Sequence, residues 1–181
     1  MSIMITKSGK FFNFDDPDNF DYDIGSIAWS LAHQCRFNGH IDTFYSVAQH
    51  SVGVSHIVPD KDALAGLLHD SAEAFMGDVV RPVKMVFPAI KELEEIIRRA
   101  IFRKFGLDEE LPSVVKCADE SMLSTERRDL LSFFPNTKEA RKIWNPEEDF
   151  ASQHLKIIPL PPVYAYDQFL SRFHDLKKFL G

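Results

Sequence analysis

The sequence predicts an all-α domain, an orthogonal array of helices with a small β-hairpin at the N-terminus. Most of the chain repeats apolar residues every three or four positions, which is the spacing of an amphipathic helix. Residues 3–14 differ, because two short apolar stretches flank Ser8-Gly9 there, a pattern typical of a hairpin. The 181 residues are 45% hydrophobic and 27% charged, which suits a single domain spanning residues 1–181 with a substantial core.

Proline, glycine and capping residues divide the helical pattern into separate elements. The first helix is expected to begin after Asp23, a good N-cap, and to end at Asn38-Gly39. Further helices are expected at residues 43–58, 62–75, 89–105, 113–133, 137–143 and 164–180. Loops are expected at residues 15–19 and 78–88, and prolines should keep residues 156–163 extended.

Charge and composition exclude several classes of protein. The net charge is -6 and no stripe of Lys or Arg is present, so neither nucleic acid nor an anionic membrane is an expected partner. No apolar run approaches the roughly 18–20 residues of a membrane span, and the N-terminus does not resemble a secretory signal. Cys35 and Cys117 are isolated, which fits a reducing compartment. We therefore expect a cytoplasmic protein.

The most informative segment is Leu68-His69-Asp70-Ser71-Ala72-Glu73. If residues 62–75 form one helix, His69 and Glu73 share a face and Asp70 lies about 100° away from His69. The preceding residues 63–68 are apolar, which predicts a buried helix. Burying an imidazole and two carboxylates is costly unless a cation compensates them, so these side chains could hold a divalent metal and its bound water.

His50 and Asp119, on two other predicted helices, extend this set. Taken alone, His50 fits a hydrogen-bonded core histidine better than a metal ligand. Asp119 taken alone fits a residue on a solvated helix face as well as it fits a ligand. Combined with His69-Asp70, they would supply two nitrogens and two carboxylate oxygens from three core helices. The combination therefore favours a metal site.

The order His50, His69-Asp70, Asp119 resembles the HD-domain metal-dependent phosphohydrolases, and most nearly the HD-domain 5'-deoxynucleotidases and related phage and bacterial HD nucleotide hydrolases. The resembling pieces lie within residues 22–130. They are Arg36-Phe37-Asn38-Gly39-His40, Tyr45-Ser46-Val47-Ala48-Gln49-His50-Ser51, Leu68-His69-Asp70-Ser71-Ala72-Glu73, Gly77-Asp78, Pro82-Val83-Lys84 and Lys116-Cys117-Ala118-Asp119. The resemblance implies the HD-domain helical array, with one divalent metal held by His50, His69, Asp70 and Asp119. Such a donor set suits Co, Mn, Zn, Fe or Ni better than Mg.

The resemblance also implies roles for the residues around the metal. Glu73 matches a catalytic acid/base carboxylate that orients or deprotonates the attacking water, and Asp78 matches a catalytic carboxylate at the substrate. The implied substrate-binding residues are Arg36, Phe37, Lys84 and His40. Arg36 and Lys84 would contact phosphate. Phe37 stands where the deoxynucleotidases usually carry Trp, so the resemblance does not define the sugar that is accepted.

The expected function is metal-dependent hydrolysis of nucleotides, with (deoxy)nucleoside 5'-monophosphates converted to nucleoside and phosphate by a metal-activated water. The alternative is a deoxynucleoside triphosphate triphosphohydrolase, which would release triphosphate. Two rival classes are a non-catalytic nucleotide-binding module and a di-iron oxygenase, and the latter needs a further His-Asp pair that the second and third predicted helices lack. The apolar C-terminal helix 164–180 and the resemblance both indicate a homo-oligomer.

Overall fold

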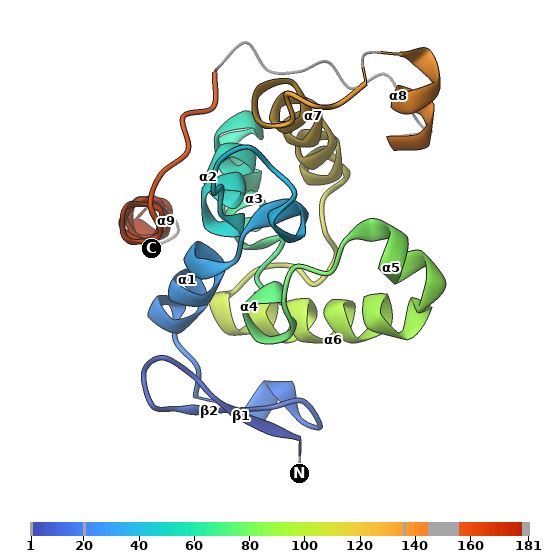
Figure 1. Ribbon diagram of the computed structural model, residues 1–181. Helices are drawn as coiled ribbons and strands as arrows, with labels where there is room; N and C mark the ends of the chain where they lie inside the picture. Colours follow the sequence, from blue (N-terminus) through green and yellow to red (C-terminus); the bar gives the residue numbers. More distant parts are fainter. Residues whose placement is uncertain (1, 20, 136, 145–155, 179–181) are drawn as a thin grey trace.

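A computed structural model describes residues 2–19, 21–135, 137–144 and 156–178. This part of the chain is mostly helical and contains a two-stranded antiparallel sheet, which confirms the predicted hairpin and helical class. Strand β1 (Ile3–Ile5) pairs with β2 (Phe11–Asn13) so that Met4 lies opposite Phe12. The hairpin lies at the end of the molecule that contains the N-terminus, opposite α7 and α8 (Figure 1).

Nine α-helices and three short 3-10 helices follow in the described ranges. They are η1 (Pro17–Asn19), α1 (Ile24–His33), η2 (Arg36–Gly39), α2 (Val47–Ile57), η3 (Asp60–Asp62), α3 (Ala63–Leu68), α4 (Glu73–Met76), α5 (Arg81–Val86), α6 (Pro88–Phe105), α7 (Ser113–Leu130), α8 (Lys138–Trp144) and α9 (Pro162–Lys178). The N-cap of α1 is Asp23, as predicted, because its Oδ1 accepts a hydrogen bond from the Ser26 amide at 2.7 Å. Helix α6 also begins and ends close to the predicted positions.

Several boundaries differ from the prediction. The first helix ends at His33, and the Arg36–Gly39 segment forms η2 instead of continuing it. The second begins at Val47, because Ser46 is its N-cap and accepts a hydrogen bond from the Gln49 amide at 3.1 Å. Residues 17–19, expected in a loop, form η1.

Helix α5 lies in a segment that was expected to be a loop. The prediction was wrong because Pro82 was taken as a helix breaker. Pro82 lies in the first turn of α5, where the backbone nitrogen needs no intrahelical acceptor, so proline is tolerated there. As a result Lys84 is carried by a helix and not by an irregular loop.

The single helix predicted over residues 62–75 is interrupted after Leu68. Residues 69–72 form a tight turn in which the Ser71 amide donates to the Leu68 carbonyl and the Glu73 amide donates to the Asp70 carbonyl, each at 3.0 Å. These bonds span three residues instead of four, which is the pattern of a 3-10 helix. Helix α4 begins at Glu73, so His69 and Glu73 are not on one face of a continuous α-helix.

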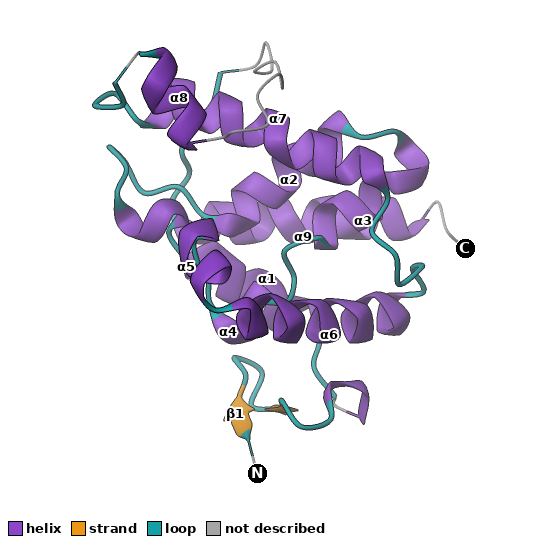
Figure 2. Cartoon of the chain, turned by 90° about the vertical axis from the view of Figure 1, so that its right-hand side faces the viewer, coloured by secondary structure: helices purple, strands orange, loops and turns teal. Residues whose placement is uncertain are grey.

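Helix α2 lies at the centre of the core and packs against α1, α3, α7 and α9. In Figure 2, α7 lies on one side of α2 and α3, and α6 lies on the other. Gly66 allows α2 and α3 to approach closely, since a Cβ at this position would lie 3.2 Å from the Cα of Ser55. Helix α2, which carries His50, and α3, which directly precedes His69, are therefore packed together at the centre of the fold.

The apolar face of α9 is buried inside the described structure. Phe169 is fully buried and Phe173 is 5% exposed, and α9 contacts α1, α2 and α3. This face is therefore not available to a second copy of the chain. The apolar C-terminal helix no longer supports the predicted homo-oligomer, which now depends on the family resemblance alone. The last two residues of the helix predicted at 164–180 lie outside the described residues. No helix in the described ranges combines the length and apolar character needed to cross a membrane.

Candidate metal centre

The four side chains predicted as metal ligands converge between α2, the turn after α3, and α7. Nε2 of His50 lies 3.1 Å from Oδ1 of Asp119 and 3.6 Å from Oδ2 of Asp70. Nε2 of His69 lies 3.2 Å from Oδ1 of Asp70 and 4.0 Å from Oδ1 of Asp119. One ligand atom each from His50, His69 and Asp119 lies within 4.8 Å of the others, so this group could hold a metal ion.

A fixed acceptor orients each of the two histidines. Nδ1 of His50 lies 2.6 Å from Oε1 of Glu126, and Nδ1 of His69 lies 2.8 Å from the carbonyl oxygen of Gly66. A carboxylate and a backbone carbonyl can only accept, so each Nδ1 carries a proton in these bonds. In the neutral imidazole, Nε2 then presents its lone pair to the centre of the group.

The environment of the two Nε2 atoms fits a cation. Both atoms are buried and neither has a hydrogen-bond partner in the part of the chain that the structure describes, although carboxylate oxygens lie within 3.1 and 3.2 Å. Lone pairs and anionic oxygens at this separation repel one another unless a positive charge lies between them. Two nitrogens with two carboxylates form a donor set for a divalent transition metal, so the residues present fit the predicted ion.

The charges of the site agree with this assignment. Burial disfavours ionised Asp70 and Asp119, but the neighbouring histidines outweigh it and keep the pKa of both carboxyls below its usual value. Burial and Arg36 oppose protonation of His50, yet Glu126 and Asp119 outweigh them and raise its pKa to about 9 without a metal, so a bound metal would displace a proton from Nε2. The fully buried His50 and the 33% exposed Asp119 side chain mark the closed and open sides of the group.

Glu73 belongs to a second group of potential ligands, which does not include the two histidines. A turn with about three residues per repeat places Glu73 beside Asp70, and ligand atoms of Asp70, Glu73 and Glu94 lie within 4.8 Å of one another. Nζ of Lys84 lies 3.4 Å from Oε1 of Glu73 and 2.7 Å from Oε2 of Glu94. Burial and the charge of Asp70 raise the pKa of Glu73 well above its usual value. Glu94 was not predicted, although it lies four residues after Ile90 and three before Ile97, on the apolar face of the predicted helix.

Arg36 is buried beside the four predicted ligands and is paired with a residue that the prediction missed. Its Nη2 and Nε donate to Oε2 of Glu126 at 2.9 and 3.3 Å, and its Nη1 lies 3.7 Å from Oδ2 of Asp70. Glu126 follows Asp119 by seven residues, which is about two turns of a helix, so both lie on the same side of α7. This spacing is the sequence signal that could have identified Glu126.

Gln34 links the segments that carry Glu73 and Asp78. Its amide nitrogen donates to the Glu73 carbonyl at 2.8 Å, and its amide oxygen accepts from the Asp78 backbone nitrogen at 2.9 Å. Burial raises the pKa of the Asp78 carboxyl.

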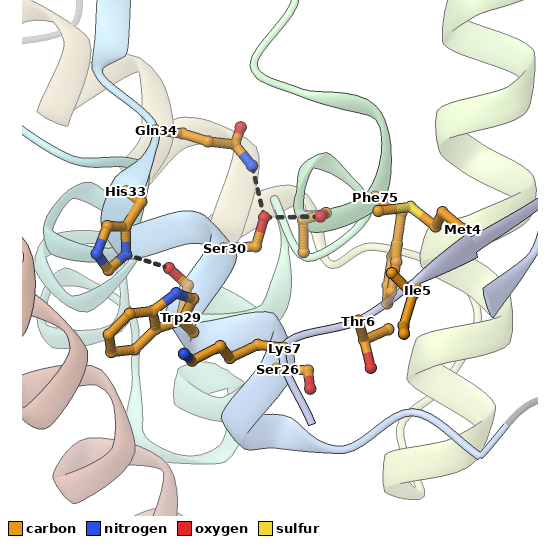
Figure 3. Close-up of a pocket in the computed structure, with 11 residues that line it drawn as sticks. Met4, Ile5, Thr6, Lys7, Ser26, Trp29, Ser30, His33, Gln34 and Phe75 are labelled. Atoms are coloured by element: carbon orange, nitrogen blue, oxygen red, sulfur yellow. Dashed lines mark hydrogen bonds between the residues drawn. The ribbon is translucent and has the colours of Figure 1, made fainter. Parts of the chain in front are cut away.

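Gln34 and Ser30 also line a cavity of about 440 Å³ beside the hairpin, and none of the four predicted ligands lines it. Figure 3 shows Gln34 bonded to Ser30, whose hydroxyl donates to the Ala74 carbonyl.

Of the remaining predicted residues, Phe37 lies in η2 and His40 directly follows it. Phe37 and Asn38 have φ values of 57° and 51°, a left-handed conformation that is uncommon outside glycine. The Phe37 ring lies 5.7 Å from that of Trp144 in α8, and 5.4 Å from the guanidinium of Arg36. His40 is exposed and belongs to neither group of potential ligands among the described residues.

Comparison with known proteins places the chain in a family. No family model matches it. It is 41% identical over 179 residues to the uncharacterized protein YfdR of Escherichia coli K12, and the alignment covers 98% of this chain and 97% of YfdR. It is 31% identical over 188 residues to an uncharacterized protein of Rhodobacter capsulatus, with 96% and 95% covered. Because both similarities extend over nearly the whole lengths, the chain belongs to the family of the uncharacterized protein YfdR.

Proposed function

We propose that this protein is a metal-dependent phosphohydrolase of the HD-domain type, which hydrolyses (deoxy)nucleoside 5'-monophosphates to nucleoside and phosphate. The observation that carries the proposal is the pair of buried Nε2 atoms, of His50 and His69, that face carboxylate oxygens and have no hydrogen-bond partner in the described ranges. His50, His69, Asp70 and Asp119 would hold one divalent ion, which supplies Lewis-acid activation of a water and of the phosphoryl group.

Glu73 is suited to move the proton of the attacking water. Its side chain is 3% exposed, and its Oε2 has no hydrogen-bond partner among the described residues. The raised pKa brings its proton exchange closer to neutral pH than that of an ordinary glutamate. The Glu73 carboxylate would therefore accept the water proton and later return it to the leaving oxygen.

Two cations flank this arrangement and would bind the phosphate. Arg36 offers Nη1, which lies 3.7 Å from Oδ2 of Asp70, and Lys84 lies on the Glu73 side. Two further cations that a triphosphate could contact, Arg81 and Arg103, pair with carboxylates outside the two groups of potential ligands. Arg103 pairs with Asp18 and Glu109. Arg81 pairs with Glu120. This distribution of charge supports a short phosphate over a triphosphate.

A product assay tests the proposal. The purified protein is incubated with Mn, Co or Zn and with deoxynucleoside mono- and triphosphates, and the products are separated by ion-exchange chromatography. Orthophosphate from monophosphates is expected, and its disappearance in Asp119→Ala excludes a contaminating phosphatase. Tripolyphosphate from a triphosphate would replace the proposal with the triphosphohydrolase, and no product with any metal would leave a nucleotide-binding module.

A further inference from the structure

Glu126 lies behind the metal-ligand group and bonds to residues on both sides of it. Its side chain in α7 is fully buried. Oε1 accepts from Nδ1 of His50 at 2.6 Å, whereas Oε2 accepts from Nη2 and Nε of Arg36 at 2.9 and 3.3 Å. One carboxylate therefore holds both a predicted metal ligand and the predicted phosphate-binding arginine.

The charge of Glu126 makes these two bonds interdependent. Its contact with the Arg36 guanidinium at 2.9 Å is the geometry of an ionised carboxylate. The negative charge is shared by two oxygens, one for each partner. In a buried network, a change in the strength of one charged hydrogen bond alters the other.

We propose that Glu126 is a positioning residue that couples anion binding at Arg36 to metal binding at His50. The inference rests on the proposed function, because it takes Arg36 as the residue that meets phosphate. When a phosphate oxygen accepts from Arg36, the guanidinium shares its positive charge between the phosphate and Glu126. Glu126 then polarises the His50 N–H more strongly, and the Nε2 atom becomes a better metal ligand.

Phosphate and metal should therefore strengthen each other's binding by the same factor, as thermodynamic linkage requires. Direct contact between a phosphate and the metal would also produce such cooperativity. The two sources can be separated, because a change at Glu126 leaves the four predicted ligands and Arg36 in the chain. The part of the cooperativity that depends on Glu126 is the part that passes through its carboxylate.

The test is calorimetric titration of the chelator-treated full chain with Co²⁺, with and without inorganic phosphate. In the wild-type protein, phosphate is expected to tighten Co²⁺ binding about fivefold or more. Glu126→Gln should weaken Co²⁺ binding about 10–100-fold, the usual effect of losing the partner of a ligating histidine, and should reduce the enhancement by phosphate. Glu92→Gln, on the exposed surface of α6, is the matched control and should behave as wild type.

A second pair of variants keeps the test decisive if Glu126→Gln does not fold, since that change leaves Arg36 buried without its counter-ion. Arg36→Gln with Glu126→Gln removes both charges and should fold, as circular dichroism would show, while binding Co²⁺ weakly and with a reduced phosphate effect. Arg36→Gln alone should keep tighter Co²⁺ binding than the double variant but lose the part of the phosphate effect that passes through Glu126.

The outcomes for this inference and for the proposed function are distinguishable. Unchanged Co²⁺ affinity and an unchanged phosphate effect in folded Glu126 variants would overturn the coupling, even if the wild-type protein hydrolyses nucleotides. If the Co²⁺ affinity and the phosphate effect depend on Glu126 but no nucleotide is hydrolysed, the coupling is supported and the hydrolase proposal fails. The titrations measure binding only, so neither result depends on turnover.

Discussion

Two neighbouring acidic groups in this protein solve the same electrostatic problem in different ways. In the group of His50, His69 and Asp119, two buried Nε2 atoms have no hydrogen-bond partner among the described residues, and the nearby guanidinium of Arg36 is paired with Glu126. The group of Asp70, Glu73 and Glu94 contains the ammonium of Lys84, 2.7 Å from Glu94. The comparison teaches that an acidic cluster indicates a metal only where the chain does not supply the compensating charge itself.

Asp70→Ala should have the largest effect, because Asp70 faces both groups. Its loss removes a predicted ligand and the carboxylate that lies near both histidines. Metal content measured by atomic absorption after dialysis against Co²⁺ should fall to background, and nucleotide hydrolysis should disappear with it. Full metal content in a folded Asp70→Ala protein would contradict its role as a ligand.

Glu73→Gln should separate metal binding, assigned to the histidine group, from catalysis, assigned to Glu73 in the second group. Glu73 contacts Lys84 and not the histidines, so the metal should remain bound. Loss of the acid/base carboxylate should lower kcat by about 10²–10⁴-fold. Parallel measurements of Co²⁺ stoichiometry and of phosphate release check both statements, and near-normal turnover would remove Glu73 from the mechanism.

Lys84→Ala should make the second group resemble the first. Without the ammonium, Glu73 and Glu94 lose their counter-ion, and the free energy of unfolding should fall by about 1–3 kcal/mol in the presence of a chelator. Oxygen ligands favour Mn²⁺, so Mn²⁺ should restore part of this loss. Urea unfolding measures the change, and Lys91→Ala on the exposed side of α6 is the control. An equal response of both variants to Mn²⁺ would show that Lys84 does not act as the built-in cation.

Asp23 belongs to neither acidic group, so Asp23→Ala serves as the reference for the other variants. It should have the smallest effect on the protein. Burial opposes ionisation of Asp23, but hydrogen bonds from Ser8 and Ser26 outweigh it and lower its pKa below 3.8. The stabilising effect of the Asp23 charge is therefore complete at neutral pH. It is lost as the pH falls through the lowered pKa of Asp23 in the folded protein.

Removing this N-cap should cost about 1 kcal/mol at pH 7, with no response to metal. Below about pH 4 the difference from wild type should narrow, because Asp23 becomes protonated in the unfolded and then in the folded chain. Urea unfolding at several pH values measures it. A difference that does not change with pH would mean that the charge of Asp23 contributes nothing to the cap.

Sequence periodicity was sufficient for the long elements and for the location of the site. Helix α6 is amphipathic along its whole length, and the segments carrying His50, His69 and Asp119 were each assigned to core helices. Apolar spacing does not distinguish four-residue from three-residue backbone hydrogen bonds, so the turn at residues 69–72 was missed. The grouping of Glu73 with Asp70 depends on that turn and could not be predicted.

The partners behind the site were harder to predict than the ligands. Glu126 repeats the position of Asp119 two turns later, so the pattern contained its signal. Glu94 acquired its role through α5, a helix that was not expected because of Pro82. The sequence thus indicates which side chains face the core, whereas the charges that neutralise them depend on contacts between distant helices.

The absence of a side chain at Gly66 has a consequence for which ions the protein would accept. The carbonyl of Gly66 holds His69, and its bare Cα lets the backbone of α2, which carries His50, come close. The two imidazole rings are thereby held with their centroids 5.3 Å apart. A methyl group at position 66 would press on α2 and widen this gap. The size of the ion that the proposed site could hold would thus depend in part on a residue that supplies no ligand atom.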